Sequence, residues 1–110
     1  MTPDALWSFE FIDNKERHGA GVVVFYRNKV LGGNHGFTYI GEYSLRGDEI
    51  SFRVNVKKIN DEVKGIYKDE YVFVAKGKYD DLSFIITGSP DDNDEFTLAI
   101  QCTRQGEIPD

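Results

Sequence analysis

The 110-residue chain has one cysteine and only short apolar runs. With Cys102 alone, no disulfide can form within the chain, which fits a reducing compartment. The segment from Met1 to Asp13 lacks a basic start followed by a long apolar stretch, so we expect no signal peptide. No apolar run approaches the ~20 residues that a membrane-spanning helix needs. These absences predict a cytoplasmic protein without a membrane partner.

Basic residues are also in short supply. The chain has 13 Lys and Arg against 19 Asp and Glu, which gives a formal net charge of −6 and a pI near 4.8. Lys57-Lys58 is the only adjacent basic pair in the sequence. An acidic surface repels phosphate backbones, so we expect no direct nucleic-acid partner.

Groups that hold metals or cofactors are few. His18 and His35 are the only histidines, and both fall in predicted turns, where we expect exposed loop residues. A metal site needs several convergent ligands, and the sequence has neither paired cysteines nor a His-Glu-x-x-His pattern. It has no cofactor motif either. The sequence therefore predicts neither a metal site nor a cofactor.

The single cysteine alternates with Leu98 and Ile100, which predicts that Cys102 is a small buried residue of the core. The alternative role is a nucleophile, which would need a polar site and a nearby base such as His35. The chain shows no set of nucleophile, base and orienting group, so we expect no enzyme activity.

What the chain has in abundance is alternation of apolar and polar residues, from Ala5 to Arg104. About eight short runs follow this pattern, and Gly, Asn or Asp separates nearly every pair of runs. The aromatic share of 14% favours strands, and the three prolines lie at a terminus or in a predicted turn. Residues 1–110 are therefore predicted to form one antiparallel β-domain.

Individual strands and turns follow from this alternation. Strands are predicted at Ala5–Ile12, Gly19–Tyr26, Val30–Leu31, Phe37–Leu45, Ile50–Val56, Glu70–Tyr79, Leu82–Ile86 and Phe96–Cys102. Turns or loops are predicted at Asp13–His18, Arg27–Lys29, Arg46–Asp48, Asp80–Asp81 and Gly88–Asp94, with a polar tail at Gln105–Asp110. The segment Lys57–Lys68 leaves the β pattern, and either one helical turn or an irregular crossing loop fits it.

Glycines mark two special places. Three of them lie within Gly32-Gly33-Asn34-His35-Gly36, which predicts a bend with positive φ. A phosphate loop is not expected there, because no Gly-Lys-Ser/Thr ending and no helix follow. Gly41 lies between Tyr39 and Tyr43, which predicts a kink or the close approach of another backbone.

Sequential strands joined by short turns form a meander. Eight such strands usually close into a barrel, because closure removes exposed edges. A two-sheet sandwich is the alternative, but a single long connection leaves little chain for its crossovers. The predicted fold is all-β, a small closed antiparallel barrel of about eight strands.

Most aromatic residues alternate onto one predicted face and are expected to fill the core. Eight-stranded barrels sometimes hold a small apolar ligand inside. The rings that we expect to line such a cavity are Trp7, Phe9, Tyr39, Tyr43, Phe52, Phe73 and Phe84.

The run Asp91-Asp92-Asn93-Asp94-Glu95 has the composition of a calcium loop but not its spacing. An EF-hand loop alternates its ligands, has a central Gly and ends in Glu, whereas these acids are contiguous. We expect a solvated hairpin loop. Its carboxylates are candidates for docking a basic protein partner: Asp91, Asp92, Asp94 and Glu95.

Several motifs together resemble a known family. They are Trp7-x-Phe9-x-Phe11, Gly19-x-Gly21-Val22-Val23-Val24, Gly32-Gly33-x-x-Gly36-Phe37-x-Tyr39-x-Gly41-x-Tyr43, Leu98-x-Ile100-x-Cys102 and Gly106-Glu107-Ile108-Pro109. The glycine–aromatic segment is the most specific of them, and the likeness covers nearly the whole chain. On these residues the chain resembles the GrlR-type negative regulators of type III secretion and their uncharacterised bacterial relatives.

The resemblance implies a lipocalin-like (calycin-like) barrel that forms a homodimer and has no enzyme activity. In regulators of this type, an acidic stretch of alternating Glu and Asp is associated with binding a transcriptional activator. The corresponding turn here is Arg46-Gly47-Asp48-Glu49. Only Asp48 and Glu49 match the acidic pattern, and Arg46 has the opposite charge.

We therefore expect a cytoplasmic bacterial regulator that sequesters a basic protein partner. Asp48, Glu49 and the run Asp91–Glu95 are the residues expected to bind it. Charge would speed the encounter, and exposed apolar residues would supply affinity. The alternative function is a carrier of a small apolar ligand inside the barrel.

Overall fold

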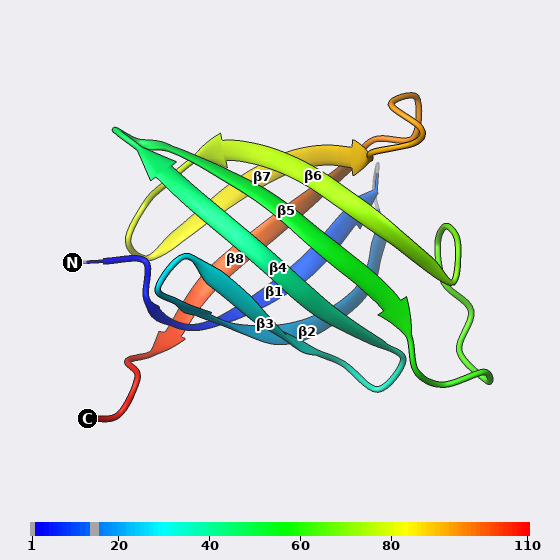
Figure 1. Cartoon of the computed structure of the whole chain (residues 1–110), viewed down its shortest axis with the longest axis horizontal. Helices are drawn as coiled ribbons and strands as arrows, with labels where there is room; N and C mark the ends of the chain where they lie inside the picture. Colours follow the sequence, from blue (N-terminus) through cyan, green and yellow to red (C-terminus); the bar gives the residue numbers. More distant parts are fainter. Residues whose placement is uncertain (1, 14–15) are drawn as a thin grey trace.

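The computed structural model describes residues 2–13 and 16–110, and within these ranges the chain forms strands and turns but no helix (Figure 1). The strands are β1 Ala5–Asp13, β2 Glu16–Tyr26, β3 Lys29–Gly33, β4 Phe37–Arg46, β5 Glu49–Lys58, β6 Glu70–Lys78, β7 Ser83–Pro90 and β8 Leu98–Gly106. Each strand pairs antiparallel with the next one along the chain.

The first and last strands close the sheet. β1 pairs with β8 over most of its length, with Phe9 opposite Cys102 and Phe11 opposite Ile100. The eight strands thus form a closed barrel in sequence order, which confirms the predicted fold class and excludes the two-sheet sandwich. This architecture is consistent with the lipocalin-like barrel that the resemblance implies.

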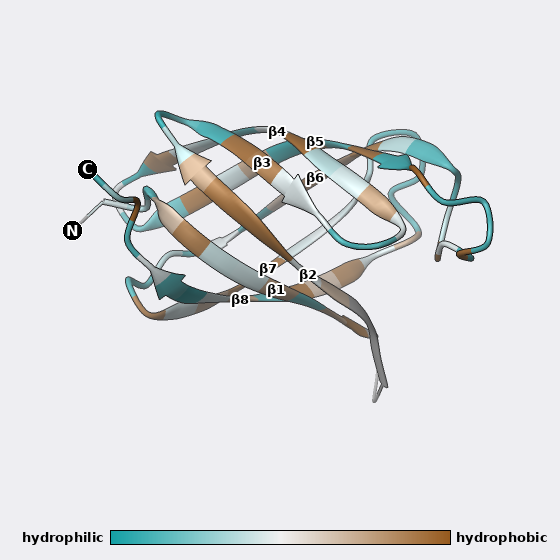
Figure 2. Cartoon of the chain, turned by 90° about the horizontal axis from the view of Figure 1, so that it is seen from below, coloured by the Kyte–Doolittle hydropathy of each residue, from teal (hydrophilic) through white to brown (hydrophobic). Residues whose placement is uncertain are grey.

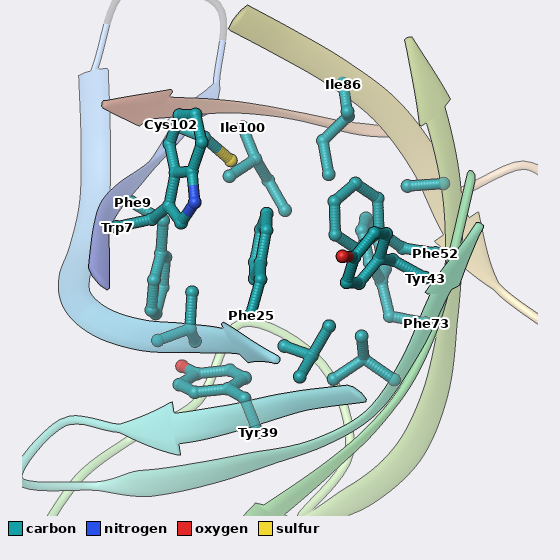
Figure 3. Packing of buried hydrophobic residues seen from close by; sticks show 14 of the residues in the cluster. Trp7, Phe9, Phe25, Tyr39, Tyr43, Phe52, Phe73, Ile86, Ile100 and Cys102 are labelled. Atoms are coloured by element: carbon teal, nitrogen blue, oxygen red, sulfur yellow. The ribbon is translucent and has the colours of Figure 1, made fainter. Parts of the chain in front are cut away.

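The interior is built by the alternation seen in the sequence. On β5, for example, Ile50, Phe52, Val54 and Val56 are buried, whereas Arg53 between them is exposed. Figure 3 shows rings from β1, β2, β4, β5 and β6 converging inside the barrel. Alternation fails at one predicted position: Leu82 is 71% exposed, because it lies in the β6–β7 turn before β7 begins.

Two tight turns follow the predicted chemistry. Arg27 and Asn28 have φ values of 49° and 67° in the β2–β3 turn, and Gly47 has a φ of 61° in the β4–β5 turn. Positive φ at both central residues, as in the β2–β3 turn, or at a first central Gly alone, as in the β4–β5 turn, matches a two-residue hairpin to the twist of its strands.

The glycine-rich segment is different from its prediction. Gly32, Gly33 and Gly36 do not have positive φ, so the predicted left-handed bend is wrong. Gly32 lies in β3, where a Cβ would be 2.1 Å from the carbonyl oxygen of Val22 on β2. The prediction for Gly41 is confirmed as a close approach, since a Cβ there would lie 2.1 Å from the carbonyl oxygen of Arg53.

Several boundaries also move. β1 continues to Asp13 and β2 begins at Glu16, so strands extend into the segment predicted as a turn at Asp13–His18. β7 continues through Pro90 and β8 begins only at Leu98, after Phe96. Between Lys58 and Glu70 the chain forms an irregular loop, which decides between the two predicted structures for this segment.

The antiparallel order gives the barrel two distinct ends (Figure 1). One end carries the β2–β3, β4–β5 and β6–β7 turns and both termini, and we call it the closed end. The other carries the β3–β4 connection at residues 34–36, the β5–β6 loop at residues 59–69 and the β7–β8 loop at residues 91–97, and we call it the open end.

Candidate functional site

A cluster of side chains centred on Trp7, Arg104 and Asp4 packs across the closed end, and we call it the plug. Trp7 is fully buried, and its Nε1 donates a hydrogen bond to the carbonyl of Pro3 at 2.8 Å. The guanidinium carbon of Arg104 lies 4.9 Å from the centre of the Trp7 ring, and the Arg104 side chain is only 7% exposed. A cation held over an indole face is a favourable arrangement, and more so away from water.

Arg104 also ties separate segments together. Its Nε donates to the carbonyl of Asp81 at 2.6 Å, and its Nη2 donates to the carbonyl of Thr2 at 2.7 Å and to the Tyr79 hydroxyl at 3.0 Å. Its Nη1 lies 3.1 Å from the carboxylate of Glu107. One side chain of β8 therefore joins the N-terminal segment, the β6–β7 turn and the C-terminal tail.

Asp4 completes the plug. Its carboxylate accepts hydrogen bonds from the Tyr43 hydroxyl at 2.6 Å and from the backbone N–H of Arg27 at 3.2 Å. Burial, and secondarily the Asp4 carboxylate, raises the pKa of Tyr43 above its usual range. The phenol therefore stays neutral and donates its proton to Asp4.

The barrel interior holds one small apolar cavity of about 60 Å³ among the described residues. Its lining includes four of the predicted residues, namely Phe9, Tyr39, Phe52 and Phe73. The other three, Trp7, Tyr43 and Phe84, do not line it, which corrects the prediction. Trp7 stacks on Phe25 and meets Phe84 edge-on. Phe84 stacks on Phe52, and the Tyr43 ring is tilted against Phe25. An apolar cavity of about 150 Å³ is known to take up benzene, so this interior is close to filled.

Cys102 lies within this apolar interior. It is 3% exposed, and burial raises the pKa of its thiol to about 12. A thiol that stays protonated near neutral pH is a poor nucleophile. His35 belongs instead to the open end, in the β3–β4 connection, and is exposed. The side chain of His18 lies outside the described residues.

The acidic candidates fall into two groups that the fold keeps apart. Asp48 lies in the β4–β5 turn and Glu49 begins β5, both at the closed end, whereas Asp91–Glu95 belongs to the β7–β8 loop at the open end (Figure 1). The structure therefore does not bring the predicted residues into one site.

Some of these acids already have basic neighbours. Asp91 pairs with Arg53 at 3.1 Å, and Asp48 lies 3.9 Å from Lys78. Asp92 accepts hydrogen bonds from the Lys68 ammonium and from the Tyr67 hydroxyl, and these bonds hold the pKa of the Asp92 carboxyl below its usual range.

The β5–β6 loop folds across the open end. Its start is held by the N–H of Ile59, which donates to the carbonyl of Gly36 at 2.8 Å. Its end is held by Lys68 and by Tyr67, whose ring stacks on Phe96 with centres 5.2 Å apart. Between these anchors, Val63 and Ile66 pack against the core.

A pocket of about 210 Å³ lies beneath this loop. Its floor is formed by Phe11, Tyr39, Val56 and Tyr71, which also line the interior cavity. Its walls and roof come from the β3–β4 connection, the start of β4 and the β5–β6 loop: Asn34, His35, Phe37, Val63, Lys64, Gly65 and Ile66. Sequence reasoning missed this pocket, because the alternation pattern says nothing about how an irregular loop folds back.

The outer surface carries a feature that sequence reasoning also missed. Leu6, Val24, Leu31 and Ile40 are direct cross-strand neighbours on β1, β2, β3 and β4. With two flanking residues of β2 they form what we call the apolar outer face: Leu6, Val22, Val24, Tyr26, Leu31 and Ile40. Five of these side chains are 36–53% exposed, and the apolar stretch of β2 is visible in Figure 2.

Within residues 2–13 and 16–110, no three His, Cys, Asp or Glu side chains come together in an arrangement that would hold a metal ion. The same part of the chain has no helix long and apolar enough to span a membrane. No protein-family model matches the chain, and no curated protein matches it either.

Proposed function

We propose that this protein is a non-enzymatic regulatory domain that forms a homodimer and sequesters a basic protein partner. The observation that carries the proposal is the apolar outer face. Contiguous apolar side chains exposed on a folded domain mark sites of interaction with other proteins. The rest of the barrel does not require this face to be apolar, since the inward side chains of the same strands already form the core.

A second copy of this chain is the occupant that we assign to the apolar outer face. Directly beside the apolar row, Lys29 on β3 lies opposite Glu42 on β4, and both are exposed. A two-fold axis that passes between Lys29 and Glu42, at the margin of the face, would bring Lys29 of each copy toward Glu42 of the other. A patch that is complementary to itself in this way fits an isologous dimer interface.

The carboxylates outside this face support the choice of a basic partner. Glu49, Asp94 and Glu95 are exposed and have no ion pair with any residue that the structure describes. With a net charge of −6, such groups would accelerate encounter with a positively charged protein. Asp91 and Asp92 contribute less free charge because Arg53 and Lys68 neutralise them.

The interior gives little support to the carrier hypothesis. A cavity of about 60 Å³ has room for one or two water molecules, at roughly 30 Å³ each, and not for a ligand of ordinary size. A drug-sized ligand usually occupies a pocket of about 300–1,000 Å³.

Sedimentation velocity tests the homodimer. The wild-type protein should sediment as a dimer, and the Leu31→Lys/Ile40→Lys variant should sediment as a monomer, because two buried ammonium groups would oppose association. The matched control is Ile85→Lys on β7, whose wild-type side chain has the same exposure as Ile40, 54% against 53%. A monomeric wild type, or equal dissociation of the control, would contradict the assigned interface.

Charge reversal tests the sequestration. The Asp94→Lys/Glu95→Lys variant should lose a partner that the wild type captures from its host, whereas Asp61→Lys/Glu62→Lys, an exposed acidic pair in the β5–β6 loop, should keep it. A partner retained by both variants would contradict an acidic docking site at the β7–β8 loop.

A further inference from the structure

We infer that the pocket beneath the β5–β6 loop is a binding site for a small aromatic or alkyl carboxylate, with the apolar body on the pocket floor and the carboxylate at Lys64. No residue of the apolar outer face or of the β7–β8 loop lines this pocket, so the inference does not depend on the proposed protein-binding function.

The size of the pocket sets the size of the ligand. At about 210 Å³ it is larger than the cavity of about 150 Å³ that takes up benzene. It is smaller than the pockets of about 300–1,000 Å³ that hold drug-sized molecules. One substituted ring, or an alkyl chain of similar volume, is therefore the appropriate occupant.

The lining selects the chemistry. The floor and roof are apolar, with Phe11, Val56, Val63 and Ile66 among the contacts. No Asp or Glu lines the pocket, although such residues are numerous in this chain. The charged side chain among the lining residues is Lys64, in the roof. A lining without anionic groups and with one ammonium favours an apolar acid over an apolar amine.

Hydrogen-bond donors near the floor add to this preference. Asn34 Nδ2 donates to the Tyr39 hydroxyl at 3.3 Å, which leaves the phenol proton of Tyr39 available to donate onward. Burial raises the pKa of both Tyr39 and Tyr71 to about 12, so both phenols keep their protons near neutral pH. Neutral phenols can donate to a ligand oxygen without repelling a negative charge.

The pocket is also held in shape before any ligand arrives. The Ile59 N–H and the Asn60 amide bond to carbonyls of the β3–β4 connection, at 2.8 Å and 3.4 Å. Tyr67 and Lys68 join the other end of the loop to Asp92. A site whose walls are ordered in advance loses less conformational entropy when it binds.

The test is a nuclear magnetic resonance titration of the ¹⁵N-labelled full chain with 4-ethylbenzoate and, separately, with 4-ethylbenzyl alcohol. The two probes share a ring and an ethyl group, and only the first carries a charge. We expect 4-ethylbenzoate to shift the amides of Gly36, Val63 and Gly65 with a Kd on the order of 1 mM or lower. The alcohol should bind at the same residues about twofold to fivefold more weakly, as expected for loss of one partly exposed ion pair.

Two variants and a control separate the roles of shape and charge. Lys64→Met should remove the preference for the carboxylate, whereas Lys57→Met, on the outer face of β5, should keep it. Val63→Trp should fill the pocket and weaken the binding of both probes at least tenfold. If this variant does not fold, the comparison of Lys64→Met with Lys57→Met still tests the proposal. Absence of shifts at the open end, or equal binding of both probes to the wild type, would overturn the inference.

Discussion

The two ends of this barrel are built from the same eight strands but differ in how their connections pack. At the closed end, polar groups are matched to one another: the side chains of Trp7, Arg104 and Asp4 form hydrogen bonds with Pro3, Thr2 and Tyr43, respectively. At the open end, a loop spans the barrel from two anchored points and leaves a pocket beneath it. The closed end is therefore held by polar contacts among its own segments, whereas the open end has an apolar pocket covered by a loop.

This difference between the two ends shows how a barrel with a filled interior can still offer a binding site for a small ligand. The interior is largely occupied by aromatic and aliphatic side chains, and its cavity measures only about 60 Å³. The β5–β6 loop lies outside the sheet and contributes fewer buried side chains to the core than the strands do. Function can then reside in the open-end loops and on the outer wall.

The largest expected effect comes from removing the centre of the closed end. Arg104→Ala should lower the free energy of unfolding by about 2–4 kcal/mol, because it removes the donor to the carbonyls of Asp81 and Thr2 and uncovers the Trp7 ring. Arg53→Ala is the control, since that side chain is 58% exposed and pairs with Asp91 of the open-end loop. We expect a change below about 1 kcal/mol for the control, measured by urea denaturation. Similar losses for both variants would remove the distinction between the ends.

A smaller effect is expected from the aspartates. Asp4→Ala should cost about 1–2 kcal/mol, because the Tyr43 hydroxyl loses its charged acceptor in a partly buried setting. Asp91→Ala, which removes an exposed pair at the open end, should cost less than about 1 kcal/mol. Thermal denaturation of the two variants side by side measures the difference, and an equal or reversed order would contradict it.

The smallest expected effect is a shift in titration at the open end. The pKa of Asp92 is held below its usual value of 3.8 by Lys68 and Tyr67, so its contribution to stability is present above pH 3.8 and is lost as the pH falls through the lowered pKa. Lys68→Met should move the carboxyl titration of Asp92 back upward, toward 3.8. Carbon-detected nuclear magnetic resonance of the side-chain carboxyl measures it. An unchanged midpoint would show that the ion pair does not persist in solution.

The barrel itself could be predicted from the sequence because its signal is local. Alternation such as Ile50, Phe52, Val54 and Val56 identifies an inward face without knowledge of any neighbouring strand, and the positive φ at Gly47 follows from its turn. The positive φ predicted for the glycine segment was wrong for the converse reason. Gly32 is required by the β2 backbone lying against it, and such a contact is visible only once the strands are paired.

The binding surfaces could not be predicted for a related reason. β2 carries apolar residues on both of its faces, as in Val22-Val23-Val24-Phe25, so the pattern does not distinguish core from surface. The apolar outer face also requires the register that sets Val24 beside Leu31 and Leu31 beside Ile40. The acidic candidates are far apart because successive connections of an antiparallel meander lie at opposite ends of the barrel, and the β4–β5 turn and the β7–β8 loop are at different ends.

The pairing of β1 with β8 has a consequence for how the protein is made. The Ser8 hydroxyl and the Thr103 carbonyl that meet across this seam are separated by 95 positions in the chain. During synthesis, at about 5–20 residues per second, β1 is made before β8 and keeps one edge unpaired until β8 has emerged. The Trp7–Arg104 contact can form only at that point, so the closed end cannot assemble earlier. Truncated products ending before β8 would keep an open apolar edge that quality-control proteases can recognise.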